Sequence, residues 1–300
     1  MAKRTDNVMN EPEPIVLRST SNPTVRRLVR MRDNRARRRA GKILVDGWRE
    51  TAQALSAGLN LCGVYLPESH SPAEPADSTA AEVRQMLRNS RAHQHWVSDA
   101  VMQKISYGQS SRGVVAEFDQ PEQVLGQLDL PPRPLLLVLD RIEKPGNVGA
   151  VFRCADAAGV DAVLLCDCRG DVFNPNAIRN SLGAVFRMPS ATASQAEIAE
   201  FLVAHRVRAV AARVEASTPL WTSPLQTPLA IILGNEAEGL GDRWTELGNQ
   251  PIAGIRIPMY GDVDSLNLSV SAAVLAFEAA RQNWHTGADP KPNVSQRETL

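Results

Sequence analysis

The second half of the chain alternates apolar runs with amphipathic segments, which is the pattern of strands joined by helices. Continuous apolar runs at residues 135–139 and 162–166 are typical of strands buried on both faces of a sheet. Between them, a polar turn at 140–149 leads into a helix predicted over 150–158, and Gly159 follows at the usual C-cap position. Such a unit makes its two strands parallel, with a right-handed crossover. The polar turn therefore lies at the carboxyl edge of a parallel sheet, where open α/β sheets bind ligands.

The same alternation along the whole chain predicts two α/β domains. In the first part, strands are predicted at residues 43–45, 61–66, 95–97 and 113–118, and helices from Pro23 onward and at 49–57, 80–90 and 98–106. In the second part, the remaining strands are predicted at 185–188, 207–211, 229–233 and 254–257, and the remaining helices at 174–181, 196–205 and 269–284. The resulting organisation is a disordered tail at 1–14, a small domain at 15–118, a proline-rich linker at 119–134, a larger domain at 135–284 and a polar tail at 285–300.

Length and composition exclude several classes of protein. The 300 residues are 43% hydrophobic and 22% charged, as in a globular protein large enough for two cores. No apolar run reaches the roughly 20 residues that cross a bilayer, and the first 14 residues contain no apolar signal segment. The four cysteines form no CxxC pair, which favours free thiols in a reducing compartment over a zinc site. We therefore expect a cytoplasmic protein with no membrane partner and no metal.

The positive charge of the chain is concentrated near its N-terminus, although the formal net charge is zero. Residues 1–50 hold thirteen Lys or Arg and only six Asp or Glu, an excess that is typical of contact with a phosphate backbone. A charged helix face that meets only solvent gives the same pattern, so the charge needs support from a second feature. The candidate RNA-binding residues are Arg26, Arg27, Arg37, Arg38 and Arg39.

Three loops that follow predicted strands of the second domain carry candidate chemistry. The first loop (140–153) contains Asn147 and Arg153. The second loop (234–241) reads GNEAEGLG, and its glycines allow positive φ and close approach of a ligand. The acids of the second loop argue against a phosphate ligand and suit one with positive charge or hydroxyl donors. The third loop (258–269) supplies short hydrogen-bonding side chains, which are Ser265, Asn267 and Ser269.

Several enzyme classes are disfavoured because their motifs are missing from the sequence. There is no GxxxxGK[ST] phosphate loop, and no GxGxxG dinucleotide turn follows the first strand of the second domain. No histidine lies in the three loops, which disfavours a nucleophile–base–acid hydrolase. An arginine, amides, a carboxylate and hydroxyls can position substrates and stabilise charge without forming a covalent intermediate.

The order and spacing of the three loops resemble the three signature motifs of the SpoU (TrmH-like) RNA ribose methyltransferases of the SPOUT class. The motifs are Asn147-x-Gly149-x-x-x-Arg153, Gly234-x-Glu236-x-x-Gly239 and Ser265-Leu-Asn267-Leu-Ser269, and the resemblance covers residues 135–284. The first domain is similar to the ribosomal-protein-like RNA-binding domain of the family. The stretches that carry this similarity are 21–28, 43–50 and 112–116, with Asp46 where many relatives carry Glu.

The resemblance implies an α/β fold with a parallel sheet and a deep trefoil knot in the C-terminal SPOUT domain. It implies transfer of a methyl group from S-adenosylmethionine to a ribose 2′-hydroxyl, and a homodimer that forms through the C-terminal domain. By similarity, Arg153 is catalytic and serves the cofactor of the partner subunit, and the pocket is shaped by Asn147, Glu236, Ser265 and Asn267. The cofactor is held by Leu233, Gly234, Asn235, Gly239, Ile257, Met259, Leu266 and Ser269.

Alternatives to this interpretation remain open from the sequence. Considered by itself, Arg153 could be a helix residue that faces solvent, and Ser269 could be only the N-cap of the last helix. The expected substrate is ribosomal RNA, with transfer RNA as the alternative. A catalytically silent RNA-binding dimer of the same fold and an unknotted nucleotide-dependent enzyme are the other hypotheses. The methyltransferase hypothesis requires that Asn147, Glu236 and Asn267 meet in the folded protein.

Overall fold

The computed structural model describes residues 15–68, 78–88, 90, 92–108, 113–168, 170–215 and 218–284. Chain contacts divide the protein into two compact units, Met1–Asp119 and Gln120–Leu300. The tails expected at 1–14 and 285–300 lie outside the described residues, as does Arg112. None of the helices in the described ranges combines the length and the apolar content that crossing a membrane requires.

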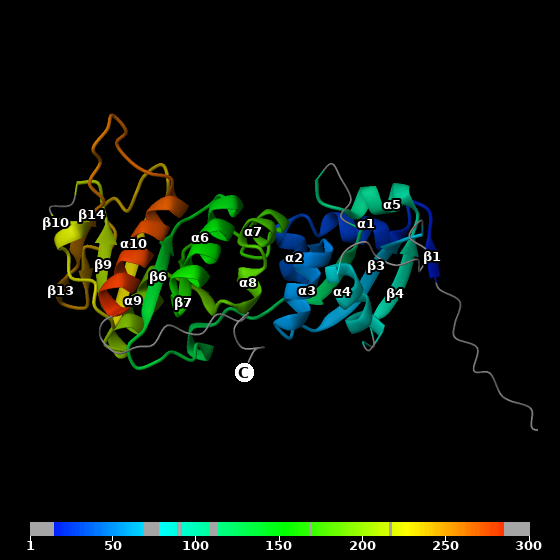
Figure 1. Cartoon of the computed structure of the whole chain (residues 1–300), viewed down its shortest axis with the longest axis horizontal. Helices are drawn as coiled ribbons and strands as arrows, with labels where there is room; N and C mark the ends of the chain where they lie inside the picture. Colours follow the sequence, from blue (N-terminus) through cyan, green and yellow to red (C-terminus); the bar gives the residue numbers. More distant parts are fainter. Residues whose placement is uncertain are drawn as a thin grey trace, which may run out of the picture. The chain divides into compact units, whose positions relative to one another are not determined.

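The first unit is built on a mixed five-stranded sheet with helices on both faces (Figure 1). The strands are β1 (Ile15–Leu17), β2 (Lys42–Asp46), β3 (Leu61–Pro67), β4 (His93–Val97) and β5 (Val115–Asp119), in the order β1-β4-β3-β5-β2. The helices are α1 (Pro23–Arg30), α2 (Asn34–Ala40), α3 (Trp48–Ser56), α4 (Ser78–Arg88) and α5 (Asp99–Ile105). Apolar residues of α1 and α5 form the core on one face, and those of α3 and α4 form the core on the other.

The arginine-rich stretch forms two helices, whereas the sequence pattern predicts one that begins at Pro23. Asn22 caps α1, because its Oδ1 accepts a hydrogen bond from the Thr24 amide at 2.8 Å. Asp33 caps α2 in the same way, and Gly41 ends that helix with a φ of 61°. Asn and Asp both favour the N-cap position, and Asp33 starts a second helix at the point where a single unbroken helix would continue.

The second unit is built on a seven-stranded sheet in which every neighbouring pair of strands is parallel. Its strands are β6 (Leu135–Asp140), β7 (Ala162–Cys166), β8 (Ser190–Ala193), β9 (Arg208–Ala212), β10 (Thr218–Pro219), β11 (Leu229–Leu233) and β14 (Ala253–Arg256), in the order β10-β14-β9-β11-β6-β7-β8. Its α-helices are α6 (Pro145–Ala158), α7 (Pro175–Ser181), α8 (Ala184–Arg187), α9 (Gln195–Ala204) and α10 (Leu268–Trp284). A short antiparallel pair, β12 (Glu246–Leu247) and β13 (Gln250–Pro251), and two 3-10 turns, η1 (Leu125–Gln127) and η2 (Leu220–Thr222), complete the described part.

The sheet of the second unit is covered on both faces. Helices α6 and α10 pack against each other over β6 and β11 (Figure 1), and α7 packs on α6. Buried residues of α9 form a core with the opposite face of the strands. The segment at 120–134 also packs on this core through Leu125, Leu128 and Leu130, and the Gln123 carbonyl accepts a hydrogen bond from the Thr192 amide.

Two predicted elements of the second unit are wrong in type or in extent. The strand predicted at 185–188 is helix α8, and strand β8 follows it. Gly183 adopts a left-handed conformation and starts that helix, and a short apolar run does not by itself distinguish a strand from a buried helix. Helix α6 begins at Pro145, a residue that is tolerated in the first turn, and so it contains Asn147 and Gly149.

Candidate functional site

Three side chains from distant parts of the chain meet at the carboxyl edge of the parallel sheet. Asn147, in the first turn of α6, donates a hydrogen bond from Nδ2 to Oε1 of Glu236 in the second loop. Asn267, in the third loop, donates from Nδ2 to Oδ1 of Asn147 at 3.4 Å. The Oδ1 atom of Asn267 accepts from the amide of Ser269 at 2.9 Å and from its hydroxyl at 2.7 Å. The three loops therefore converge as the sequence predicts.

Glycine allows two of these loops to approach their neighbours closely. A Cβ atom at Gly149 would lie 2.2 Å from the carbonyl oxygen of Ala177, so α6 and α7 pack at a distance that no larger residue permits. A Cβ atom at Gly234 would lie 2.2 Å from the carbonyl carbon of Gly239. The second loop is thus folded tightly back on itself.

The fold of the second loop is fixed by its own residues. The Asn235 carbonyl accepts a hydrogen bond from the Gly239 amide at 3.0 Å. The Asn235 side chain accepts from the amides of Ala237 at 2.7 Å and Glu238 at 2.9 Å. Asn235, expected to bind cofactor, therefore uses its side-chain oxygen to hold the loop.

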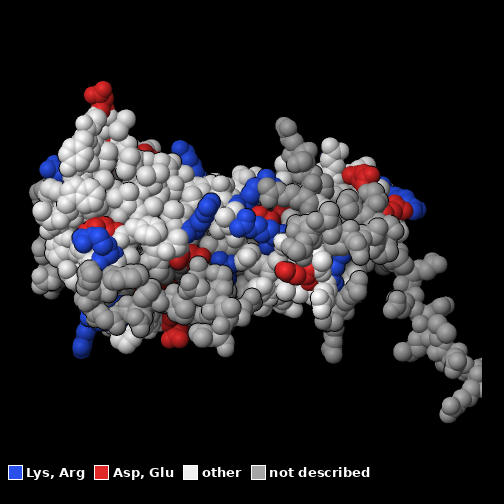
Figure 2. All heavy atoms as spheres, viewed as in Figure 1, with Lys and Arg blue, Asp and Glu red and all other residues white. Residues whose placement is uncertain are grey.

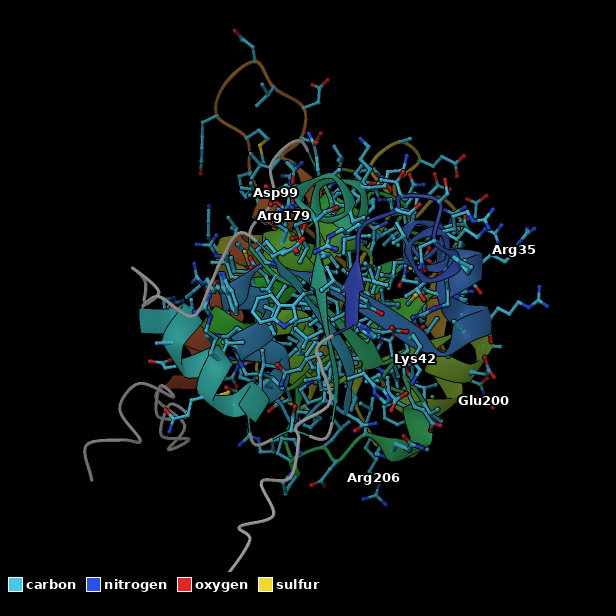
Figure 3. The ribbon with its side chains drawn as sticks, turned by 90° about the vertical axis from the view of Figure 1, so that its right-hand side faces the viewer. Arg35, Lys42, Asp99, Arg179, Glu200 and Arg206 are labelled. Atoms are coloured by element: carbon cyan, nitrogen blue, oxygen red, sulfur yellow. The ribbon has the colours of Figure 1, made fainter. Side chains whose placement is uncertain are left out.

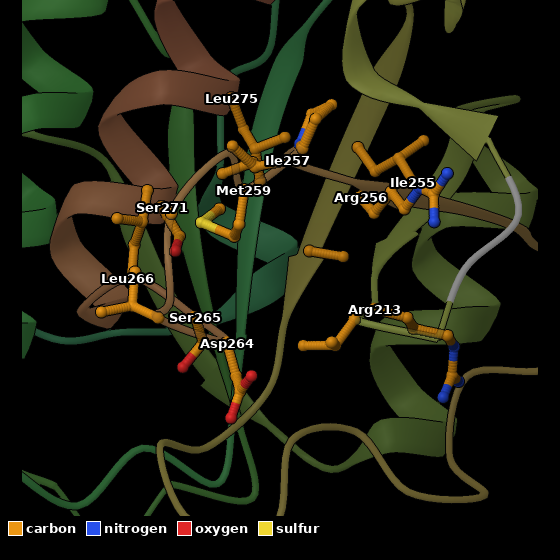
Figure 4. A pocket seen from close by; sticks show the side chains of 15 residues that line it. Arg213, Ile255, Arg256, Ile257, Met259, Asp264, Ser265, Leu266, Ser271 and Leu275 are labelled. Carbon is orange, nitrogen blue, oxygen red and sulfur yellow. The ribbon is translucent and has the colours of Figure 1, made fainter.

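A cavity of about 490 Å³ opens beside the third loop (Figure 4). Its walls come from the end of β9, from β14 and the third loop, and from the first turns of α10. The lining residues are Ala212, Arg213, Val214, Ile255, Arg256, Ile257, Pro258, Met259, Gly261, Val263, Asp264, Ser265, Leu266, Ser271 and Leu275. Apolar side chains make most of this wall, and Asp264 and Ser265 place oxygen atoms beside it (Figure 4).

Only some of the expected cofactor residues line this cavity. Ile257, Met259 and Leu266 do, together with Ser265. Leu233, Gly234, Asn235, Gly239 and Ser269 are not among its lining residues. Sequence reasoning missed Arg213 and Val214, although they directly follow β9, and the end of a parallel strand is the signal that could have identified them.

Arg153 lies apart from the three meeting side chains. It is exposed on α6, six residues after Asn147, which places it about 9 Å along the helix axis and on a different side of the helix. Within the described residues, Arg153 makes no hydrogen bond or ion pair. Within one chain, the structure thus brings Asn147, Glu236 and Asn267 together but does not add Arg153.

The cysteines near this edge are not arranged for nucleophilic chemistry. Burial raises the pKa of Cys168 to about 12 and also raises that of Cys166. Both thiols therefore stay protonated at neutral pH, and a protonated thiol is a weak nucleophile. All four cysteines are free thiols, as the sequence analysis expects.

The candidate RNA-binding arginines of the first unit fall into two groups. Arg26, Arg38 and Arg39 are exposed. Arg27 donates from Nη2 to Oε2 of Glu117 at 2.7 Å, and this contact raises the pKa of Arg27 above its usual value. Arg37 is only 1% exposed and donates to the carbonyls of Met31 at 2.6 Å and Arg32 at 2.8 Å. The prediction for Arg37 is wrong, because its guanidinium is buried in the turn between α1 and α2.

Arg30 and Arg35, which the sequence analysis did not single out, are also exposed on α1 and α2. The Arg35 side chain points away from the ribbon of its own unit (Figure 3). Basic side chains gather over α2 in Figure 2. We use the name α1–α2 arginine surface for five exposed residues, Arg26, Arg30, Arg35, Arg38 and Arg39. Arg27 is also exposed, but it is left out because it pairs with Glu117.

Comparison with known proteins agrees with the geometry of both units. Residues 134–277 match the SpoU rRNA Methylase family, and residues 22–116 match the MRM3-like substrate binding domain. A 23S rRNA (guanosine-2′-O-)-methyltransferase, RlmB of Haemophilus ducreyi, is 34% identical over 183 residues, which cover 58% of this chain and 73% of that protein.

Two solved structures cover nearly the whole chain. A crystal structure of an RNA 2′-O ribose methyltransferase is 36% identical with a TM-score of 0.76, and the match covers 90% of this chain and 99% of that one. The AdoMet-bound rRNA methyltransferase from Sinorhizobium meliloti is 26% identical with a TM-score of 0.76, and the match covers 89% and 97% of the two chains. Fold and site thus define a two-domain RNA methyltransferase. The chain belongs to the SpoU rRNA methylase family.

Proposed function

We propose that this protein transfers the methyl group of S-adenosylmethionine to the 2′-hydroxyl of a ribose in 23S ribosomal RNA. The observation that carries the proposal is the meeting of Asn147, Glu236 and Asn267, one from each family motif. The named function of the Haemophilus relative supports 23S rRNA as the substrate. The family membership supports the reaction, and it disfavours the unknotted nucleotide-dependent enzyme.

The residues of the cavity fit S-adenosylmethionine, which supplies an electrophilic methyl carbon when bound. Ile257, Met259 and Leu275 offer an apolar surface for an adenine ring. Asp264 and Ser265 offer a carboxylate and a hydroxyl to ribose hydroxyls and to positive charge. S-adenosylmethionine carries no phosphate group, so its site needs no cluster of phosphate-binding residues. The acidic side chains of the second loop agree with this.

The three meeting side chains would hold the second and third loops in a fixed relation around this ligand. In the transfer itself, the ribose 2′-oxygen forms a bond to the methyl carbon, the carbon–sulfur bond breaks, and the hydroxyl proton passes to solvent. The chain contributes mainly alignment of the reacting atoms and stabilisation of charge.

Arg153 is the residue that we assign to the RNA side of the reaction. A guanidinium offers N–H donors and no acceptor, so the role of Arg153 is to bind the target phosphate and orient the ribose rather than to accept a proton. Because Arg153 lies away from the Asn147 cluster of its own chain, we assign it to the cofactor site of a partner subunit.

A homodimer through α6 and α10 supports this arrangement. Val270 and Phe277 of α10 are 45% and 51% exposed, and a spacing of seven residues places them on one side of the helix. Helix α10 packs on α6, which carries Arg153. Contact between the same surfaces of two copies would bury these apolar side chains and bring Arg153 to the other chain.

The same proposal includes a deep trefoil knot formed by the third loop. Strand β14 lies beyond β9 in the sheet, whereas α10 packs on α6, β6 and β11. The chain must therefore cross the carboxyl edge of the sheet between them, where the second loop also lies. A crystal structure in which the third loop passes outside the second loop would contradict the knot.

The α1–α2 arginine surface is the part of the first unit that we assign to the RNA backbone. It lies inside the segment that matches a substrate binding domain. Its five guanidiniums are exposed, and phosphate contacts of this kind provide affinity without sequence specificity.

The deciding experiment maps 2′-O-methyl groups in total RNA from a strain that lacks the protein. We expect one or more 23S rRNA positions to lose the modification and to regain it when purified protein and S-adenosylmethionine are added. Loss confined to transfer RNA would replace the proposed substrate. A complete map without any lost position, together with no binding of S-adenosylhomocysteine in calorimetry, would favour the catalytically silent RNA-binding dimer.

A further inference from the structure

A buried carboxylate at the end of β6 holds a guanidinium from the other side of the site. Asp140 is 0% exposed, and its two oxygens accept from Nε and Nη2 of Arg243, each at 2.9 Å. Arg243 Nη2 also donates to Oδ2 of Asp167 at 2.5 Å and lies 3.4 Å from Sγ of Cys166. Bidentate, charge-assisted contacts of this kind fix both the distance and the orientation of the paired groups.

This cluster has the composition of a cation site, but a side chain supplies its positive charge. Ligand atoms of Asp140, Cys166 and Asp167 lie within 4.8 Å of one another. The guanidinium of Arg243 contacts all three residues, so a metal ion would have to displace it. The cluster is therefore an ionic clamp between the ends of β6 and β7 and the chain that follows β11.

The clamp acts on the chain that forms one side of the proposed cofactor site. Arg243 follows the second loop by two residues. Asp140 also faces Arg141 at 3.5 Å, and Arg141 donates to Glu238 of the second loop at 3.1 Å. The Asp140 carboxylate is thus linked to Glu238 of the second loop through Arg141, and it pairs directly with Arg243 just after that loop.

The clamp also reaches the cavity through a second arginine. The carbonyl of Gly241 accepts from Nη1 of Arg213 at 2.6 Å, and the carbonyl of Arg243 accepts from its Nη2. Arg213 lines the cavity, and in Figure 4 its guanidinium points away from the other lining side chains. Asp140, Arg243 and Arg213 therefore form a continuous series of contacts from β6 to the cavity wall.

We propose that Asp140 and Arg243 are positioning residues that set the second loop and Arg213 in the arrangement required for cofactor binding. Neither residue touches the cavity, so both act through the groups that they hold. This inference rests on the proposed function, because it takes the cavity to be the cofactor site. The clamp also limits the motion of the second loop when no cofactor is bound, and this can be measured without cofactor.

Two variants test the clamp. Arg243→Lys keeps the positive charge but cannot make the bidentate contact with the Asp140 carboxylate, and Asp140→Asn keeps the shape of the side chain but loses its negative charge. The matched control is Arg133→Met. Arg133 is an arginine of the same unit whose guanidinium donates to the backbone carbonyl of Thr227 at 2.9 Å, at the amino edge of the same sheet and away from the clamp. A double variant, Asp140→Leu with Arg243→Met, replaces the ion pair by apolar groups, an exchange that often preserves stability.

Calorimetric titration of the full chain with S-adenosylhomocysteine is the first measurement, and the Tm is recorded for every variant. We expect Kd to rise about tenfold or more in both single variants, the range that the loss of one charge-assisted hydrogen bond produces, and to stay within about twofold in Arg133→Met. The double variant should recover Tm but not affinity. A double variant with both Tm and Kd like the wild type would overturn the positioning role.

Hydrogen exchange of the ligand-free protein separates this inference from the proposed function. Amides at 234–244 should exchange faster in Arg243→Lys and Asp140→Asn than in the wild type and in Arg133→Met. Wild-type protein that does not bind S-adenosylhomocysteine would contradict the proposed function, while the exchange data would still decide whether the clamp holds the loop. Unchanged exchange at 234–244 in both single variants would overturn the clamp itself.

Discussion

At the scale of single residues, the approach of α6 to α7 depends on the absence of a side chain at Gly149. The Gly149→Ala substitution places a Cβ atom 2.2 Å from a backbone oxygen, and a backbone atom cannot yield as a flexible side chain can. We expect a loss of about 1–3 kcal/mol in the free energy of unfolding, seen as a lower Tm of the transition that reports the second unit.

Gly146 is the matched control for this substitution. It lies in the same helix, and the nearest atom to a Cβ there is Nδ2 of Asn180 at 3.7 Å, an ordinary contact. Gly146→Ala should therefore leave the Tm unchanged or raise it slightly. Equal Tm values for the two variants would show that α6 and α7 can separate at little cost.

Arg153 carries the second prediction at this scale. Arg153→Ala should abolish methyl transfer and leave the Kd for S-adenosylhomocysteine within about twofold of the wild type, because the side chain contacts neither the cavity nor the Asn147 cluster of its own chain. Turnover and calorimetry on the same preparation measure both. Normal turnover in this variant would remove Arg153 from the reaction.

The residues of the candidate site differ in how far the sequence reveals them. Asn147, Glu236 and Asn267 could be identified because each stands in a short motif after an apolar run. Arg243 could not, because its significance depends on a contact with Asp140, which is 103 positions away along the chain. Arg37 was misassigned, because nothing in a run of arginines shows which of them turns inward.

At the scale of elements, helix α2 presents arginines that are suited to an RNA backbone. Replacing Arg35, Arg38 and Arg39 together by Ala should weaken RNA binding and flatten the plot of log K against log salt. The slope should fall by about 2, since each lost phosphate contact removes roughly 0.7–0.9. Filter binding or fluorescence anisotropy at several salt concentrations measures it.

Arg18 provides the control for this prediction. It is an exposed arginine of the same unit that pairs with Glu68 at 2.5 Å and lies outside the α1–α2 arginine surface. Arg18→Ala should leave the slope nearly unchanged. A slope that stays constant in the triple variant would mean that the α1–α2 arginine surface is simply a solvated surface.

Element type was predictable where an apolar run forms a strand inside a sheet, and it failed where residues outside the run decide the conformation. The strands at 162–166 and 229–233 agree with β7 and β11 residue for residue, because a buried parallel strand is apolar on both faces. The segment at 185–188 is a helix, because Gly183 and the packing of α8 on α6 and α7 decide its conformation. Helix α2 was missed because its start depends on a single capping residue, Asp33.

At the scale of the whole molecule, the proposed dimer makes a prediction about complementation. A heterodimer of one Arg153→Ala chain and one Leu266→Glu chain contains one complete site if Arg153 serves the partner, and none if it serves its own chain. Leu266→Glu is chosen because Leu266 lines the cavity. Chains that carry different tags can be produced together and the heterodimer purified on both.

We expect the heterodimer to show about half of the wild-type activity and each homodimer to show almost none. An inactive heterodimer would place Arg153 in the site of its own chain. If sedimentation finds the wild-type chain to be monomeric under the assay conditions, the assignment of Arg153 to a partner subunit is wrong.

The sequence alone determined the local character of this protein: apolar runs that become buried parallel strands, glycines where backbones come close, and three motifs whose order indicates a methyltransferase. The motifs predict that Asn147, Glu236 and Asn267 meet, but only the tertiary structure decided which atoms of these side chains form hydrogen bonds, because strand order sets how the loops approach each other. The same holds for the burial of Arg37 and for the clamp between Asp140 and Arg243, since burial and ion pairing are properties of the space around a side chain.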